Sequence, residues 1–276
     1  MVNKITKYLF LLLLFFLPVF LPVRVFASVY LGASVKATTV NITAALDASS
    51  SNTLTLSGTG ASVLTNSGTF TCSTGTVAYE GTANTDVGAL NGASHYYNLT
   101  LGAASDNNTV VFTAGGEIEA SGSVTITSGG TGIHTLSQGN NDIGAGAVTV
   151  QSGGEWSNMG TGDLRLGGTF ANSGSVSFDS SDAGCTVGSD DILIRSNSTS
   201  TQRSWTSSGG TFYMYNVDVQ DQAGTASITV YKGTGAAQNN GTNWTFTDTC
   251  AGQSGGGGPP IRLEGKIRIK GGTRLK

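Results

Sequence analysis

Hydrophobic residues recur along most of the chain as short triplets, in which one small or polar residue separates two apolar ones. Such units have the two-residue period of a strand that buries one face, and they are rich in Thr and β-branched residues. No stretch shows helical spacing over three turns, and no proline lies between Ser28 and Gly258. We therefore expect an all-β chain. The triplets are residues 54–56, 99–101, 124–126, 148–150, 164–166, 176–178 and 217–219.

Glycine-rich clusters separate the triplets. Residues 128–132 (Ser-Gly-Gly-Thr-Gly) and 144–146 (Gly-Ala-Gly) predict corners that need a positive φ. Strands alternating with corners fit a parallel β-helix, also called a β-solenoid, or a β-sandwich. We favour the solenoid because each turn needs only a few inward apolar residues, which the next turn covers. The interval from Val124 to Val148 suits one turn, whereas a sandwich would show longer alternating strands.

A coarse duplication divides the chain. The phrase Gly-Thr-Phe begins at Gly68 and again at Gly168, and in both copies Gly-Xaa-Val and then an aromatic-rich strand follow. The two Gly-Thr-Phe phrases are 100 residues apart, but the matching residues Asn98 and Asn216 of the aromatic strands are 118 residues apart. The second copy therefore carries an insertion. The predicted segments are a signal peptide (1–27), a strand-rich lead-in (28–65), a body of two related modules (66–250), a Gly/Pro linker (251–260) and a basic tail (261–276).

Part of the body resembles a known family. The run Asp-Ile-Leu-Ile-Arg-Ser-Asn at 191–197, Ser204-Trp205, the strand at 212–219 and Asn-Asn-Gly-Thr-Asn-Trp-Thr-Phe at 239–246 are similar to the closing unit of bacterial secreted β-strand-repeat surface proteins. These are related in style to filamentous-haemagglutinin-like adhesins. The resemblance covers about residues 66–246 and implies a right-handed parallel β-helix with a structural or adhesive role at the bacterial cell surface.

The N-terminal segment reads as a secretory signal peptide. Residues 1–7 are basic, residues 8–23 are apolar, and Val25 and Ala27 supply a cleavage site before Ser28. The alternative is an uncleaved anchor, but the apolar run is shorter than the ~20 residues that cross a bilayer. We expect a secreted or surface-bound protein with no transmembrane segment once the signal is removed.

Charge and cysteine content exclude several classes. Residues 28–260 carry five basic and sixteen acidic side chains, a net charge of −11, which argues against nucleic acid as a partner. Three cysteines are too few for a disulfide scaffold or a metal site. After export one disulfide could form, and the sequence leaves its pairing open among Cys72, Cys185 and Cys250.

The histidines and carboxylates are weak candidates for chemistry. His95 and His134 lie far apart in the sequence, without neighbouring metal-ligand spacing, so we expect both simply to occupy strand surfaces. Acidic residues followed by one arginine could bind calcium or act in a β-helical polysaccharide lyase or hydrolase. Convergence in one groove would favour the enzyme, and scattered positions a scaffold. These residues are Asp179, Asp182, Asp190, Asp191 and Arg195.

Aromatic residues offer a third alternative, a carbohydrate-binding module. It would require Trp156, Trp205 and Tyr213 to lie coplanar on one outer face. We expect Trp244 and Phe246 instead to cover the open end of the coil, which would otherwise expose an apolar interior and an unpaired edge.

The C-terminal tail alternates apolar and basic residues and carries a net charge of +5. An extended strand would place the basic side chains together, which suggests contact with acidic polysaccharide or phospholipid head groups. The alternative is a disordered solubilising tail. The basic residues are Arg262, Lys266, Arg268, Lys270, Arg274 and Lys276.

The sequence therefore favours an exported, non-catalytic bacterial surface or extracellular protein that is structural or adhesin-like and needs no cofactor. Its expected partner is polysaccharide of the cell envelope or the extracellular space. A carbohydrate-active β-helix enzyme and a carbohydrate-binding module remain the alternatives.

Overall fold

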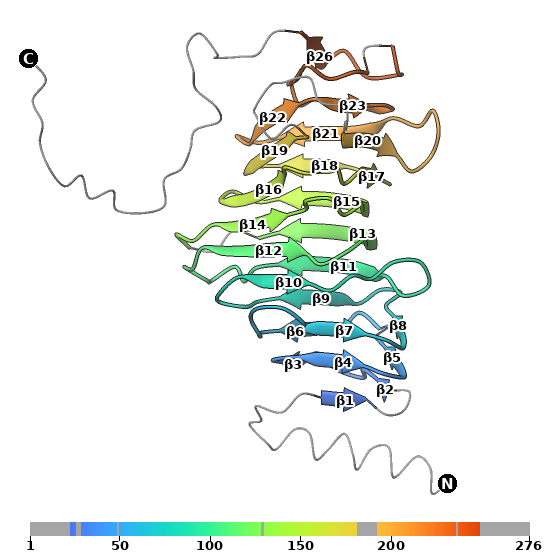
Figure 1. Cartoon of the computed structure of the whole chain (residues 1–276), viewed down its shortest axis with the longest axis vertical. Helices are drawn as coiled ribbons and strands as arrows, with labels where there is room; N and C mark the ends of the chain where they lie inside the picture. The colour runs from blue at the N-terminus through green and yellow to red at the C-terminus, as the bar shows by residue number, and fades with distance from the viewer. Residues whose placement is uncertain are drawn as a thin grey trace, which may run out of the picture.

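The computed structural model describes residues 23–25, 29–48, 50–127, 130–180, 192–235 and 237–248. These residues form only strands, turns and irregular segments. Figure 1 shows the strands stacked along the long axis of the molecule, with the N-terminal strands at one end and β26 at the other. The described part of the chain has no helix long and apolar enough to cross a membrane. The expected all-β class is confirmed.

The largest sheet takes strands from almost the whole described chain. Its twelve strands are β3 (Val35–Ala37), β6 (Thr53–Leu56), β9 (Thr76–Tyr79), β11 (Tyr96–Leu101), β13 (Ile118–Ile126), β15 (Ile143–Val150), β17 (Leu164–Leu166), β18 (Phe170–Asn172), β20 (Ile192–Ser196), β21 (Arg203–Ser207), β23 (Val217–Val219) and β24 (Gln222–Gly224). They are ordered as in the chain, except that β15 pairs with both β17 and β18, after which two parallel columns of strands continue.

A second sheet has eight strands. They are β10 (Thr85–Val87), β12 (Val110–Ala114), β14 (His134–Ser137), β16 (Gly154–Asn158), β19 (Ser175–Asp179), β22 (Thr211–Tyr215), β25 (Ile228–Tyr231) and β26 (Trp244–Thr247). Two three-stranded sheets complete the N-terminal end. One contains β1 (Val23–Val25), β4 (Val40–Ile42) and β7 (Leu64–Asn66), and the other β2 (Val29–Tyr30), β5 (Ala45–Asp47) and β8 (Thr69–Thr71).

Every pairing between the described strands is parallel, and partners lie two or three strands apart in the chain, except β25 and β26, which are consecutive. Val77 pairs with Leu99, and Leu99 pairs in turn with Val124. From β9 to β16 the chain alternates between the two large sheets. The antiparallel pairing that a sandwich would use does not occur among these strands.

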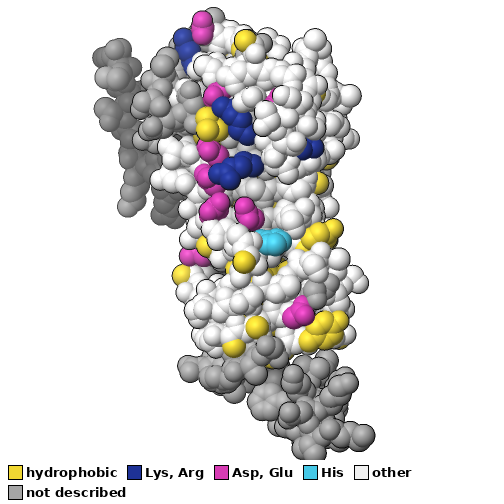
Figure 2. Space-filling model, turned by 90° about the vertical axis from the view of Figure 1, so that its right-hand side faces the viewer, with side chains coloured by type: hydrophobic (Ala, Val, Ile, Leu, Met, Phe, Trp, Pro, Cys, Tyr) yellow, Lys and Arg dark blue, Asp and Glu magenta, His cyan; other side chains and the backbone are white. Residues whose placement is uncertain are grey.

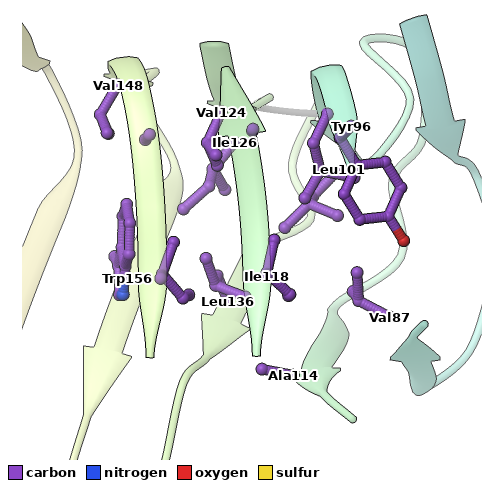
Figure 3. Packing of buried hydrophobic residues seen from close by; sticks show 14 of the residues in the cluster. Val87, Tyr96, Leu101, Ala114, Ile118, Val124, Ile126, Leu136, Val148 and Trp156 are labelled. Atoms are coloured by element: carbon purple, nitrogen blue, oxygen red, sulfur yellow. The ribbon is translucent and has the colours of Figure 1, made fainter. Parts of the chain in front are cut away.

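The predicted triplets are confirmed as strand segments, and both apolar ends of each triplet are buried. The register places these ends in columns, so that Val124 lies beside Leu99 on one side and Val148 on the other. Figure 3 shows Leu101, Ile126 and other side chains of neighbouring strands meeting in the space between the sheets. Burial of apolar area stabilises the folded chain by about 25 cal/mol per Å². Because the strands stack in register, even short strands contribute to one continuous core.

Two tryptophans in this core use the same polar device. Trp156 and Trp205 are almost fully buried. The indole Nε1–H of Trp156 donates to Gln138 Oε1 at 3.0 Å, and that of Trp205 donates to Gln222 Oε1 at 2.7 Å. Each glutamine is itself buried. A buried indole N–H without an acceptor would be costly, so a glutamine from a neighbouring turn accompanies each tryptophan.

Asparagines join the corners of successive turns. Asn84 Oδ1 accepts from the N–H of Val111, Asn107 Oδ1 from that of Thr131, and Asn140 Oδ1 from that of Thr161. The three distances are between 3.0 and 3.1 Å. Asparagine is suited to this position because its side chain replaces a backbone partner at a turn.

The positive φ predicted for the glycine clusters is wrong for their described residues. Gly130 and Gly132 lie between β13 and β14, as a corner requires, but neither has a positive φ. The second predicted corner, at 144–146, does not exist. Residues 144–146 lie inside β15 and have ordinary strand dihedrals, not a positive φ. Glycine is needed here because of close packing: a Cβ at Gly146 would lie 2.2 Å from Ser121 O. The neighbouring strand β13 carries a register irregularity between Ala120 and Ser123, which brings its backbone close.

The duplicated phrase occupies different places in the fold. Phe70 lies in β8, in a three-stranded sheet, whereas Phe170 lies in β18, in the twelve-stranded sheet. Phe170 pairs with Trp205, so the chain makes a longer excursion at that turn than it does between Leu99 and Val124. Strands β3 and β6 of the predicted lead-in belong to the same twelve-stranded sheet as the body.

The paired glutamine predicts a measurable stability effect. Gln138→Ala removes the acceptor of Trp156 Nε1–H and the donor to the Asn141 and Asp163 carbonyls, so we expect the free energy of unfolding to fall by about 2 kcal/mol. Urea titration followed by circular dichroism measures it. Thr113→Ala, at an exposed strand position, should change it by less than about 0.5 kcal/mol. An equal loss in both variants would contradict the role given to the glutamine.

Candidate functional site

A row of charged side chains follows the outer face of the twelve-stranded sheet. Figure 2 views the molecule from the side on which β17 and β20 lie in Figure 1, and it shows acidic and basic side chains gathered along that face. The charged row, as we name it, comprises Glu117, Glu119, Asp142, Asp163, Arg165, Arg195 and Asp218.

The row exists because the strands alternate. Ile143 pairs with Ile118 on one side and with Leu164 on the other, and all three are buried. The residues directly before and after them therefore lie in columns on the outer face. The same register places Arg165 beside Arg195. Like charges side by side in a sheet are unfavourable, and carboxylates on both sides offset this.

The two arginines form ion pairs of different character. Arg165 Nη2 lies 3.0 Å from Asp142 Oδ2, and their side chains are 50% and 35% exposed. Arg195 donates to the carboxylate and to the backbone carbonyl of Asp218, and their side chains are only 23% and 19% exposed. The Arg195 pair is therefore less screened by solvent.

Asp163 lies between these pairs. Its Oδ1 accepts from the Leu193 N–H at 3.0 Å, and its own N–H donates to Asp142 Oδ1 at 2.9 Å. Burial raises the pKa of the Asp163 carboxyl, and the Leu193 N–H partly opposes this. Nearby Asp142 adds to the rise, while Arg165 and Arg195 lower the pKa.

At the acidic end of the row, carboxylates also accept hydrogen bonds from other segments of the chain. Glu119 Oε2 accepts from the Gly92 N–H at 2.9 Å, and Glu117 Oε2 accepts from the Asn91 amide at 2.8 Å. Together with Asp142 and Asp163, these carboxylates bond groups on neighbouring turns. Carboxylate bonds to backbone N–H groups are among the stronger hydrogen bonds in proteins. The row thus connects turns along one face.

The proposed enzyme cluster is not assembled by the described residues. Asp182, Asp190 and Asp191 lie outside them. Asp179 is buried in β19 of the eight-stranded sheet, whereas Arg195 belongs to β20 of the twelve-stranded sheet and binds Asp218. In the described part of the chain no group of three or more His, Cys, Asp or Glu side chains could hold a metal ion.

The histidines have separate surroundings. His95 is partly exposed, and its Nδ1 lies 2.9 Å from Gly92 O. His134 is fully buried in β14, with its ring edge-on to Phe112. Its Nδ1 lies 2.8 Å from Thr127 O, and its Nε2 lies 3.9 Å from the Asp106 carboxylate.

A closed hydrogen-bond chain lies within the apolar core. The Gly88 N–H donates to the Tyr79 hydroxyl, which lies 3.0 Å from the Tyr96 hydroxyl, and the latter donates to Gly88 O. Burial raises the pKa of Tyr79 to about 12 and also raises the pKa of Tyr96. Burial likewise raises the pKa of Cys72, which lies in the same interior. Cys185 and Cys250 lie outside the described residues.

The aromatic residues do not form an outer sugar-binding face. Trp156 and Trp205 are core residues, and the Trp205 ring stacks on Phe170 with centroids 4.1 Å apart. Tyr213 alone of the three predicted residues is exposed. Trp244 in β26 is buried, edge-on to Trp205 at 5.2 Å. Phe246, in the same strand, is partly buried and packs against the core.

The remaining predicted sites fall outside the described residues. They are the cleavage site at Ala27 and Ser28 and the tail residues Arg262, Lys266, Arg268, Lys270, Arg274 and Lys276. Conversely, Arg195 is the one member of the charged row that the sequence singled out. A signal for the row was present, because an acidic residue directly precedes the first apolar residue of successive strands, as in Asp142-Ile143 and Asp163-Leu164.

Comparison with known proteins adds no family. A scan against protein-family models found no match, and searches of curated proteins and of solved structures found no significant similarity. The resemblance to β-strand-repeat surface proteins therefore rests on the residues quoted from the sequence.

The two ion pairs predict unequal effects on stability. Arg195→Met leaves the Asp218 carboxylate and carbonyl without their shared donor, so we expect the free energy of unfolding to fall by about 2 kcal/mol. The matched variant Arg165→Met breaks an exposed pair and should cost less than about 1 kcal/mol. Urea unfolding of both variants measures the difference, and the reverse order would show that exposure does not rank the two pairs.

Asp163 predicts a pH effect. Its pKa is higher in the folded chain than in the unfolded chain, so its contribution to stability is present below the unfolded pKa and is lost as the pH rises through the folded pKa. The variant Asp163→Asn keeps an acceptor for Leu193 but does not titrate. Its stability relative to the wild type should therefore increase as the pH rises from below the ordinary Asp pKa of about 4 through the raised pKa of the folded chain. Urea unfolding midpoints measured at several pH values test this. The control variant Thr161→Ala removes no titrating group, so its stability should change with pH as that of the wild type does.

Proposed function

We propose that the protein is an exported bacterial surface or extracellular protein with a structural or adhesin-like, non-catalytic role. The main observation is that the most prominent polar site, the charged row, uses its carboxylates to bond neighbouring turns. Asp142 and Asp163 accept backbone N–H groups from later turns, and Arg195 is held by Asp218. Groups engaged in this way stabilise a stack of strands, and substrate is not needed to explain them.

The proposed architecture is a right-handed parallel β-helix. Support comes from the parallel register, in which Val77, Leu99, Val124 and Val148 are successive partners at similar intervals along the chain. Alternation of the chain between the two large sheets fits one coil for each such interval. Parallel crossover connections are right-handed in nearly all proteins. The end cap of Trp244 on Trp205 fits the protection of an open coil end.

Surface location and partners follow from the two chain ends. The basic and apolar N-terminal segment is proposed to direct export and to be cleaved between Ala27 and Ser28. The basic tail, residues 261–276, is proposed to contact acidic polysaccharide or phospholipid head groups. The long side of the stack would then present adhesive or structural surface to polysaccharide of the envelope or the extracellular space.

Expression of the full chain in a secreting bacterium tests the proposal. We expect mass spectrometry to find Ser28 at the N-terminus and fractionation to find the protein on the cell surface. Replacing the six basic tail residues by Gln should release it into the medium, because attraction to an anionic surface is lost. Ile267→Ala with Ile269→Ala keeps the charge and should preserve retention.

Other results would overturn parts of the proposal. An intact N-terminal segment or retention in the cytosol would contradict export, and equal retention of the Gln variant would contradict anchoring by the tail. Cleavage of polysaccharide by the wild type that is lost in Asp163→Asn would favour the alternative of a carbohydrate-active enzyme.

A further inference from the structure

Strand β1 belongs to the segment whose removal we propose. Val23 pairs with Val40, Arg24 with Asn41 and Val25 with Ile42, so β1 is the parallel neighbour of β4. The other neighbour of β4 is β7. Cleavage before Ser28 would take β1 away and leave β4 at the edge of its sheet. Such an edge offers unpaired N–H and C=O groups, to which another strand can add.

The C-terminal tail repeats the local sequence of β1. Residues 22–25 read Pro-Val-Arg-Val, and residues 260–263 read Pro-Ile-Arg-Leu. Both have a proline, an apolar residue, an arginine and a second apolar residue in the same order. The proline lacks an N–H and fits the start of a strand, and the two apolar residues keep the two-residue period. The tail thus carries the pattern that already pairs with β4.

We propose that, after removal of the signal peptide, residues 261–263 of a second copy of this chain add to β4 as a parallel strand in place of β1. Ile261 would lie opposite Val40, Arg262 opposite Asn41 and Leu263 opposite Ile42. Each copy has one β4 edge and one tail, so the contact is head-to-tail and can continue from copy to copy. The inference rests on the proposed export.

The distance along the molecule favours a second copy over the chain's own tail. The nine strands from β3 to β23 span about 38 Å at about 4.8 Å per strand. Residues 249–260 would have to be almost fully extended, to about 40 Å, to bridge this distance. The tail of a copy stacked end to end reaches the β4 edge without being stretched.

Charge also favours association. The tail carries +5, whereas residues 28–260 carry −11. Opposite charges speed encounter and add attraction that falls as salt concentration rises. The proposed contact therefore combines backbone pairing, which gives the register, with long-range attraction.

The experiment uses the processed protein from the secreting host. Mass spectrometry first establishes the N-terminus, and sedimentation velocity over a range of concentrations then measures association. We expect the wild type to form oligomers and Ile261→Asp with Leu263→Asp to stay monomeric. The matched variant Ile267→Asp with Ile269→Asp has the same charge change and should associate as the wild type does. Circular dichroism checks that all three remain folded.

Amide hydrogen exchange identifies the edge. Val40 donates to Val63 O and Ile42 O accepts from Ser67, both on the β7 side, so the Asn41 N–H faces the vacated edge. Its exchange should slow in the oligomer and stay fast in the Ile261→Asp, Leu263→Asp variant. A processed chain that remains monomeric with fast exchange overturns the inference and leaves export standing. A monomer with slow exchange means that the tail folds back on its own chain, which overturns the role of the second copy. Equal loss in both double variants overturns the assignment to residues 261–263, and an uncleaved N-terminus overturns export and this inference together.

Discussion

Parallel pairing in register between strands from successive segments of the chain is the constraint on which the rest of the structure depends. It places like positions beside each other, so an inward apolar residue such as Val124 is always flanked by others, Leu99 and Val148. The same rule applies to every other position around the turn. Apolar residues form the interior, asparagines join corners, and charged residues align on the outer face. Three-residue strands would be unstable alone and are stabilised by pairing with strands from other segments of the chain, on both sides in the case of β4, β5, β17 and β18.

The interior also shows how polar groups are accommodated in a stack. Trp156 and Trp205 each have a glutamine acceptor, and Tyr79 and Tyr96 share a closed chain of bonds with Gly88. Burial of an unpaired polar group would cost about as much as several buried methylenes contribute. The polar groups of these four aromatic residues therefore depend on partners supplied by other segments of the chain.

The sequence predicted the strands well and the site poorly, for a physical reason. A triplet such as 124–126 is recognisable because its period is local, and burial of both ends follows from that period. The charged row depends on which strands are neighbours. Arg165 lies beside Arg195, but the length of chain between two paired strands varies, so no local sequence pattern predicts this pairing. The glycines of 144–146 failed as corners for a similar reason: the need for Gly146 arises from the backbone of Ser121 on another strand.

The charged row has a consequence for how the turns are ordered. Inside the stack, Ile118, Ile143 and Leu164 are chemically interchangeable, and a slip by a whole turn would still bury them. On the outside such a slip would separate Arg195 from Asp218 and leave a partly buried guanidinium facing the wrong neighbour. The outer charges can thus distinguish correct from displaced stacking, which the uniform interior cannot do. The surface charges would then select the correct register during folding, while the apolar core supplies most of the stability.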